Sequence, residues 1–258
     1  MQNSDYLISE NPMKALVFFS LPMIIGNLFQ QVYTMADSAI VGRLVGENAL
    51  AAVGAAYSLT NIFICIAIGG GIGASVIVSQ YFGRGSYGKL KKAVYTALIS
   101  FLLISGLLGG FGLLFSRKIM IVLNTPAEVL DMSVTYLKIY FLGLPFLFMY
   151  NVLSSMFNAL GKSRIPLYFL IFSSVFNIVL DWIFVADFHL DVAGVAWATL
   201  IAQGVSVVGS FTILLKELQT MEGNADGIFA KEELLPMTKI ALPSILQQST
   251  VSIGMMLV

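Results

Sequence analysis

The chain has 258 residues, of which 58% are hydrophobic and only 11% are charged. A soluble domain carries roughly 25% charged residues, and a soluble fold cannot hide this much apolar surface, because surface grows too quickly relative to volume. The 14 basic and 14 acidic residues cancel, so no net field attracts nucleic acid. A single cysteine, Cys65, excludes an internal disulfide framework. The composition predicts a protein whose partner is the lipid bilayer, with no nucleic-acid partner.

The apolar residues are gathered in runs that are long enough to span a membrane, which takes about 20 residues of helix. The six complete candidates are residues 16–41, 50–81, 93–115, 134–157, 165–185 and 192–215. A seventh run begins near Thr238 and is still apolar at Val258. The runs lack the short alternating segments of barrel strands, and a helix satisfies its own backbone hydrogen bonds in lipid. We therefore predict an all-α membrane protein, with a six-helix transmembrane bundle followed by a truncated seventh helix.

The distribution of Lys and Arg predicts the orientation, because cytoplasmic loops carry an excess of these residues. With a cytoplasmic N-terminus, only Arg43, Arg117 and Lys118 lie outside, and Lys138 lies near the start of the fourth span. The inner face then holds Lys14, Arg84, Lys89, Lys91, Lys92, Lys162, Arg164, Lys216, Lys231 and Lys239. We predict a multi-pass protein of the plasma (inner) membrane with its N-terminus inside.

A short repeat suggests how the chain is divided. Leu21-Pro22 near the start of the first span has a counterpart in Leu242-Pro243 of the last apolar run. An even number of helices returns the chain to the same face, so the two units would be parallel repeats, as in transporters built from two halves. We predict a transmembrane lobe over residues 1–215, a cytoplasmic linker over 216–237 and the start of a second lobe over 238–258.

Asp37 and Asp181 are the only acidic residues inside the predicted spans. A charge at mid-membrane costs about 3 kcal/mol or more, so such a residue is a functional candidate. An alternative is that each is a polar residue near the outer end of its helix. Helical spacing places two polar groups on single faces: Asn27, Gln30, Thr34 and Asp37 in the first span, Asn177 and Asp181 in the fifth.

Lipid does not tolerate a polar stripe of this kind, so the stripe in the first span should face other helices or a water-filled cavity. Two carboxylates with an amide and a hydroxyl nearby would suit a small hard cation or a shared proton. Two close carboxylates cannot both stay ionised at low cost. The sequence thus outlines a proton or sodium switch built on Asp37 and Asp181.

Two further features of the spans concern the backbone. Pro22 removes one helical hydrogen bond and predicts a bend in the first span, which is either a static kink or a hinge that responds to protonation of Asp37. The glycine string at residues 69–73 has no preceding strand, so it fails as a phosphate-binding loop. Close packing of helices through small residues is the better interpretation.

Several segments resemble the MATE (multidrug and toxic compound extrusion) family of efflux transporters. They are VYTMADSAIVGRLVG at 32–46, SQYFGRG at 79–85, NALGKSRIP at 158–166, NIVLD at 177–181 and GVAWAT at 194–199. Together they run through nearly the whole chain in order. The resemblance implies twelve helices in two lobes around a central cavity that opens alternately to each side. It also implies export of organic, often cationic, small molecules in exchange for protons or sodium.

The resemblance also assigns roles to residues. Asp37, Asn177, Asp181 and Thr199 match a cation-coupling site in the first lobe. Pro22 matches the bending proline, and Gln30 and Tyr33 match cavity-lining positions, beside Asn27 and Thr34 of the polar stripe. No cofactor is implied apart from Na⁺ or H⁺ as the coupling ion, and no other metal site. Because the chain stops within the seventh span, the second lobe is the partner it lacks, and we expect residues 1–258 alone to be inactive in transport.

Two other functions compete with this interpretation. A lipid-linked oligosaccharide flippase of the same superfamily would need cationic residues within its cavity to hold pyrophosphate, and only Lys138 lies in a span. A membrane-embedded enzyme such as a prenyl transferase would need clustered Asp residues to bind magnesium. Asp37 and Asp181 are far apart in the sequence, and neither lies in an Asp-rich motif. The sequence therefore favours a transporter over an enzyme.

Overall fold

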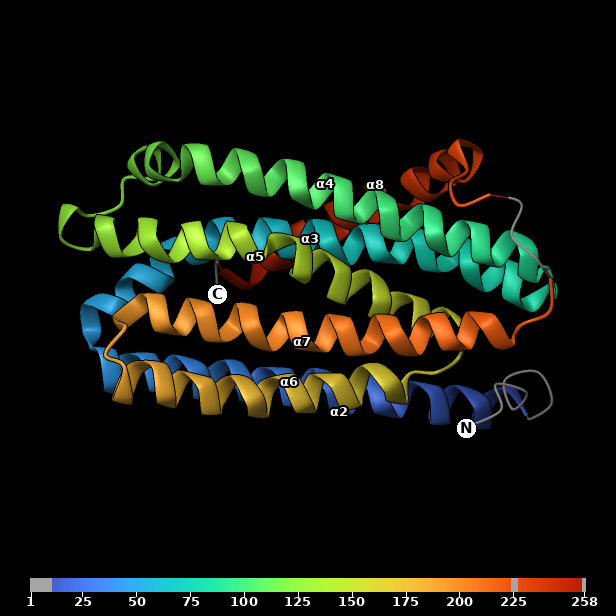
Figure 1. The fold of residues 1–258 in the computed structure, drawn as a ribbon, viewed down its shortest axis with the longest axis horizontal. Coiled ribbons are helices and arrows are strands. Elements are labelled where there is room, and N and C mark those ends of the chain that lie inside the picture. Colours follow the sequence, from blue (N-terminus) through green and yellow to red (C-terminus); the bar gives the residue numbers. More distant parts are fainter. Residues whose placement is uncertain (1–10, 224–226, 257–258) are drawn as a thin grey trace.

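The computed structural model describes residues 11–223 and 227–256, and nearly all of them are helical. The helices are α2 (Pro12–Ile40), α3 (Glu47–Gly83), α4 (Tyr87–Val122), α5 (Ala127–Ala159), α6 (Arg164–Trp182), α7 (Asp191–Thr220) and α8 (Lys231–Met256). Two π-helical turns, η1 (Val41–Val45) and η2 (Ile183–Asp187), extend α2 and α6. Successive helices run back and forth along the long axis of the molecule (Figure 1).

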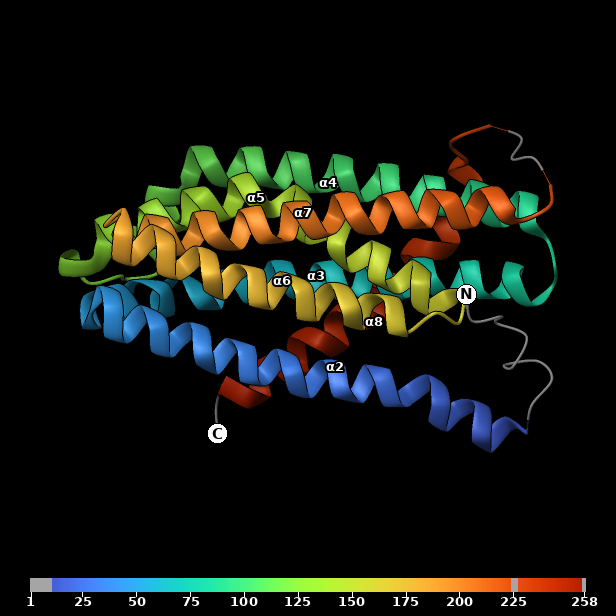
Figure 2. The ribbon, with the colours of Figure 1, turned by 60° about the horizontal axis from the view of Figure 1, so that its bottom comes forward.

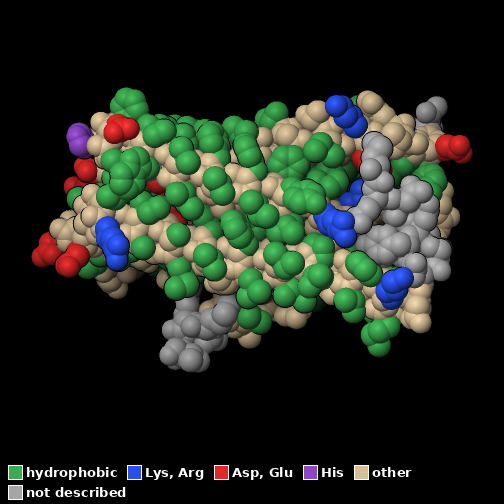
Figure 3. Space-filling view, turned by 90° about the horizontal axis from the view of Figure 1, so that it is seen from below, with side chains coloured by type: hydrophobic (Ala, Val, Ile, Leu, Met, Phe, Trp, Pro, Cys, Tyr) green, Lys and Arg blue, Asp and Glu red, His purple; other side chains and the backbone are tan. Residues whose placement is uncertain are grey.

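Among the described residues, six helical segments are long and apolar enough to cross a membrane. They correspond to α2 with η1, α3, α4, α5, α6 with η2, and α7. Hydrophobic side chains cover the middle of the face in Figure 3, and most charged side chains on that face lie toward its two ends. This division is expected of a bundle that spans a bilayer, and the predicted all-α transmembrane architecture is confirmed.

The glycine string in α3 lets this helix pack closely against three neighbours. A Cβ on Gly69 or Gly73 would lie 2.5–2.8 Å from atoms of α8, and a Cβ on Gly70 would lie 2.8 Å from the Phe101 ring of α4. A Cβ on Gly71 would lie 2.5 Å from Ser155 Oγ of α5. Each glycine thus contributes to a close helix contact, as expected of small residues at helix interfaces in lipid.

The remaining contacts form a chain of neighbouring helices. α4 packs against α5, α5 against α7, and α7 against α6. α2 lies at the edge, where it contacts mainly α6, and Figure 2 shows it along the margin of the bundle. Gly26 of α2 faces Leu167 and Leu170 of α6 at ordinary contact distance, and Ser163 Oγ donates a hydrogen bond to Phe19 O. The edge position leaves much of α2 exposed.

The polar connection between α7 and α8 is shorter than the sequence predicts. Residues 216–220 still belong to α7, and α8 already begins at Lys231. The end of α7 is stabilised by Lys91 of α4, whose Nζ donates to Met221 O at 2.9 Å and Gly223 O at 2.7 Å. A cation at a helix C-terminus offsets the partial negative charge there. Because α7 ends at Thr220 and α8 begins at Lys231, both helices extend beyond the apolar runs that were predicted to span the membrane.

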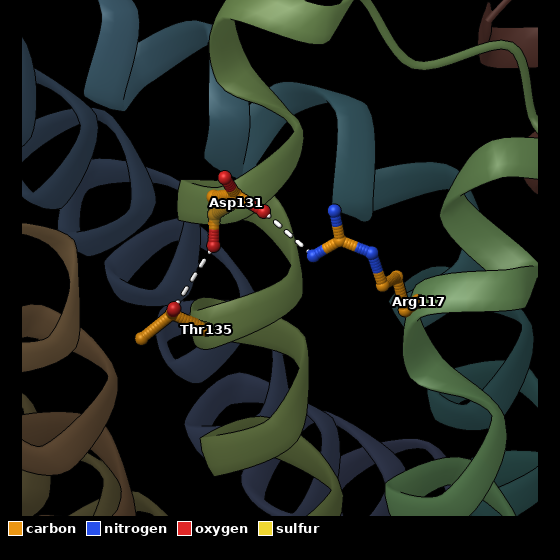
Figure 4. Close-up of polar contacts among 3 residues, drawn as sticks. All are labelled: Arg117, Asp131 and Thr135. Atoms are coloured by element: carbon orange, nitrogen blue, oxygen red, sulfur yellow. Dashed lines mark hydrogen bonds and ion pairs between the residues drawn. The ribbon is translucent and has the colours of Figure 1, made fainter.

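Ion pairs join neighbouring helices at the two ends of the bundle. At one end, Arg117 of α4 and Asp131 of α5 lie 2.7 Å apart, with 61% and 82% of their side chains exposed (Figure 4). At the other, Lys162 in the α5–α6 turn pairs with Glu217 of α7, and these side chains are only 15% and 17% exposed. Exposed pairs contribute little to stability, so the Lys162–Glu217 pair is the more consequential contact.

Candidate functional site: a pair of carboxylates between α2 and α6

The two intramembrane carboxylates meet where α2 packs against α6. Asp37 from the last turn of α2 and Asp181 from the last turn of α6 lie close enough for their charges to interact. The side chain of Asp181 is fully buried, and that of Asp37 is partly buried.

A short π-helical turn follows each acidic residue: η1 begins at Val41, beyond Asp37, and η2 begins at Ile183, beyond Asp181. In η1 the N–H of Gly46 donates to Val41 O at 3.1 Å, and in η2 the N–H of Phe188 donates to Ile183 O at 3.1 Å. Val41 and Val185 from these turns are buried in one apolar cluster with residues of α3 and α7. Turns of this kind occur frequently at functional sites. Here they anchor the ends of α2 and α6 to each other.

A chain of hydrogen bonds links α2, α6 and α7 beside the carboxylates. Tyr33 Oη donates to Asn177 Oδ1 at 2.6 Å, and Asn177 Nδ2 donates to Thr199 Oγ1 at 3.3 Å. Thr199 Oγ1 in turn donates to Val195 O at 3.1 Å. Asn177 is only 1% exposed, and both the oxygen and the nitrogen of its side-chain amide form hydrogen bonds. Buried polar groups need such partners to avoid a desolvation cost.

The structure therefore brings together Asp37, Asn177, Asp181 and Thr199, the four residues that the resemblance groups in a cation-coupling site. It adds Tyr33, for which the resemblance implies a cavity-lining role. Asn27, Gln30 and Thr34 are exposed and lie outside this cluster, and Thr34 Oγ1 donates to Gln30 O within α2. Pro22 is buried, and α2 continues through it as one helix.

The sequence analysis missed Tyr136 of α5. This tyrosine lies close enough to both Asp37 and Asp181 to interact with them electrostatically. A small cavity of about 30 Å³ lies next to it, between α5 and α7, and Thr199 and Gln203 also line the cavity. This volume holds a water molecule, which needs roughly 10–15 Å³ of such space. No sequence signal distinguishes Tyr136, because tyrosine is common within the apolar spans and α5 carries no polar stripe.

The donor set of this site fits a small hard cation or a proton. Its polar atoms are the oxygens of two carboxyl groups, an amide and hydroxyl groups, and hard cations prefer oxygen ligands. One buried oxygen of Asp37, Oδ1, has no hydrogen-bond partner among the described residues. Within the described ranges, no cluster of three or more His, Cys, Asp or Glu residues could hold a metal ion.

The long apolar helices, with two acidic residues near each other inside the bundle, define the class as a polytopic membrane protein. The family model MatE matches residues 22–183. The chain is 31% identical over 250 residues to the "Probable multidrug resistance protein YpnP" of Bacillus subtilis, over 95% of this chain and 55% of that protein. It is 26% identical over 242 residues to the "Multidrug export protein MepA" of Staphylococcus haemolyticus, over 93% and 54%.

Solved structures give the same result. A crystal structure of MATE in a bent conformation superposes with a TM-score of 0.89 at 26% identity, over 99% of this chain and 57% of that one. A MOP superfamily transporter from Pyrococcus furiosus superposes with a TM-score of 0.90 at 26% identity and the same coverage. The chain belongs to the MATE family of multidrug efflux transporters, and it spans slightly more than half the length of the relatives it matches.

Proposed function

We propose that the protein to which this sequence belongs is a secondary antiporter, exporting organic, often cationic, compounds in exchange for protons or sodium. The Asp37–Asp181 pair is the single observation that carries the proposal. Placing two carboxyl groups inside a membrane bundle is costly, and apolar residues would serve structure alone. A site that alternately holds and releases a cation explains why the carboxyl groups are present.

The surrounding residues have separate parts in this proposal. Asp37 and Asp181 hold the cation or share the proton. Asn177 and Thr199, held in place by Tyr33, orient the neutral oxygens beside it. Tyr33 and Asp37 both belong to α2, so binding or release of the cation would change the contacts that hold this edge helix. Pro22 lies in the same helix. Because proline lacks a backbone N–H, one helical hydrogen bond is already missing there and the helix can bend easily. We therefore assign Pro22 the role of hinge.

The orientation and location complete the proposal. The start of α2, the α3–α4 turn, the α5–α6 turn, the end of α7 and the start of α8 lie at the same end of the bundle (Figure 1). These segments hold most of the Lys and Arg residues. We assign this end to the cytoplasm and the protein to the plasma membrane, because cytoplasmic loops carry an excess of positive charge.

The test uses vesicles that contain the full-length gene product, an imposed proton or sodium gradient and a fluorescent organic cation. We expect gradient-dependent movement of the dye, and loss of it in Asp37→Asn, which keeps the shape of the side chain and removes its charge. Asp131→Asn, an exposed carboxylate of α5, is the matched control and should transport normally. Cells that carry Asp37→Asn and retain normal resistance to toxic cations would refute the assignment.

A further inference from the structure

Lys138 of α5 is a cation that the proposed transport site does not use. It lies eleven residues beyond Ala127, where α5 begins, and thus within a helical segment that is long and apolar enough to cross a membrane. The residue is exposed, and it does not line the small cavity between α5 and α7. In the part of the chain that the structure describes, no carboxylate forms an ion pair with it. A charge in this setting needs a counter-ion from its surroundings.

The depth of Lys138 in the membrane follows from the length of α5. The helix has 33 residues, so it is about 50 Å long, whereas the hydrocarbon core of a bilayer is about 30 Å thick. With α5 centred in the bilayer, the Cα atom of Lys138 lies about 7 Å inside the hydrocarbon, on the side where α5 begins. Side chains on a helix lean toward its N-terminus, so the amine extends toward the nearer lipid headgroups, as the amines of lysines in membrane helices do.

A second cation, Arg117 of α4, lies toward the headgroup end of the same face of α5. Asp131, Thr135 and Lys138 follow one another at steps of four and three residues, so they share this face. Arg117 Nη1 donates to Asp131 Oδ1 at 2.7 Å (Figure 4). This hydrogen bond uses one of the five N–H donors of the guanidinium, which leaves others for a second oxyanion. The Thr135 hydroxyl donates to Asp131 O and therefore adds no donor. Two cations against one carboxylate leave this face with a net positive charge.

The surface becomes apolar beyond Lys138, toward the middle of α5. Leu142, one turn further along the same face, is 48% exposed, and Leu114 and Leu107 of α4 are 81% and 76% exposed. α4 lies across the bundle from α2 and the carboxylate pair (Figures 1 and 2). This side of the molecule thus presents two cations next to an exposed apolar surface, an arrangement that suits a phosphate attached to acyl chains.

We propose that Arg117 and Lys138 together bind the phosphate of an anionic phospholipid in the outer leaflet, with its acyl chains against Leu142 and the exposed leucines of α4. A lipid phosphate lies at the depth that the Lys138 amine reaches, whereas a free anion would have to leave water to meet it. Cations near a bilayer surface attract anionic lipids. The choice of leaflet rests on the proposed orientation, in which the α4–α5 connection is outside. The binding itself does not depend on transport.

The experiment measures the thermal unfolding of the full-length gene product in a neutral detergent while phosphatidylglycerol is added. This lipid has a phosphate as its only charged group. We expect it to raise the melting temperature of wild type, because a ligand that binds only the folded state stabilises that state. In Lys138→Gln and in Arg117→Gln, the lipid concentration that gives half of this rise should be at least about five-fold higher, because each variant removes one of the two cations.

Lys118→Gln is the matched control. It removes a cation from the same end of α4, whose amine lies 5.7 Å from the centre of the Phe115 ring, and it should respond to the lipid as wild type does. An equal response of Lys138→Gln and wild type would overturn the proposal. So would a loss of response in Lys118→Gln as large as that in Lys138→Gln, because the attraction would then belong to the general charge of this end. A rise of the same size with inorganic phosphate alone would show that a free anion binds, and would overturn the assignment to a lipid.

A second measurement counts the bound lipids and does not depend on the stability of the variants. Mass spectrometry of the intact protein released from detergent should find one phosphatidylglycerol molecule more on wild type than on Lys138→Gln at the same lipid concentration. Equal numbers on the two proteins would contradict the proposal. Labelling of a cysteine at residue 117 from the cytoplasmic side would overturn the choice of leaflet. Dye transport is measured separately, so lipid binding without transport would count against the proposed antiport and not against this site.

Discussion

At the scale of single residues, the two carboxylates of the site are not equivalent. Asp181 is completely buried at the end of α6, whereas Asp37 is only partly buried on the edge helix. In the proposed mechanism, Asp37 is therefore the carboxylate that an entering cation meets first, and Asp181 is the fixed half of the pair.

Tyr33 offers a test of the hydrogen-bond chain that does not alter either carboxylate. Tyr33→Phe keeps the ring and removes the hydroxyl that donates to Asn177 Oδ1, a hydrogen bond whose loss costs about 0.5–1.5 kcal/mol. We expect a lower melting temperature in detergent and a several-fold weaker apparent affinity for the coupling cation. Tyr168→Phe, which removes an exposed hydroxyl from α6, should change neither. Unchanged cation affinity in Tyr33→Phe would show that the chain does not support the site.

At the scale of helices and turns, the site depends on how α2 ends. η1 stops at Gly46, whose φ of 115° and ψ of 174° fall in a region that residues with a Cβ rarely adopt. We expect Gly46→Ala to destabilise the protein by about 1–3 kcal/mol and to weaken cation binding, because η1 follows Asp37 closely. Thermal unfolding and a cation titration measure the two effects.

Gly54→Ala is the control for this prediction. Gly54 lies within α3, and a Cβ there would meet nothing within 4 Å. Alanine is the better helix former, so we expect this variant to be as stable as wild type. Equal melting temperatures for Gly46→Ala and Gly54→Ala would mean that the end of η1 can relax without affecting the fold.

The two ion pairs at the ends of the bundle should differ in their importance. Glu217→Gln removes the charge that faces the largely buried Lys162, and a buried charge without its partner is strongly destabilising. Asp131→Asn removes a partner from an exposed pair, whose contribution is about 0–1 kcal/mol. We therefore expect Glu217→Gln to lower the melting temperature clearly more than Asp131→Asn. The reverse order would show that the α5–α6 turn is held to α7 by other contacts.

At the scale of the whole molecule, transport needs a cavity that closes on one side while it opens on the other. The transmembrane potential supplies about 2.3 kcal/mol per charge per 100 mV. This energy is useful only when cation and substrate binding are coupled within one alternating structure. The chain covers 57% of a solved MATE transporter, so the walls that correspond to the rest of that structure are not formed by residues 1–258.

We accordingly expect residues 1–258 alone to insert into a membrane with the N-terminus inside and to move no dye across vesicles under a proton or sodium gradient. The orientation is measured by labelling single cysteines at Lys89 and Arg117, which lie at opposite ends of the bundle. Labelling of the residue 117 position from outside and protection of residue 89 is the expected pattern. Gradient-dependent dye movement by this chain would contradict the prediction and would suggest that two copies assemble into a complete carrier.

The sequence by itself determined the helices and the candidate residues of the site. Apolar runs of spanning length can only be helices, because lipid offers no partner for backbone N–H and C=O groups. Asp37 and Asp181 stood out for a similar reason, since a carboxylate in such a run is costly. Helical spacing placed Asn177 on the same face as Asp181, and the resemblance to a family added Thr199. The sequence also indicated that the glycine string at residues 69–73 is a site of close helix packing, which the structure confirms.

Only the tertiary structure decided which helices are neighbours, and therefore which of these residues meet. Tyr136 lies near the carboxylates because α5 packs against α7 beside them, and α8 lies on α3 because Gly69 and Gly73 admit its backbone. Contacts of this kind join residues far apart in the chain. They depend on the shapes of whole helix faces, and in a membrane the apolar faces that meet lipid and those that meet other helices have nearly the same composition.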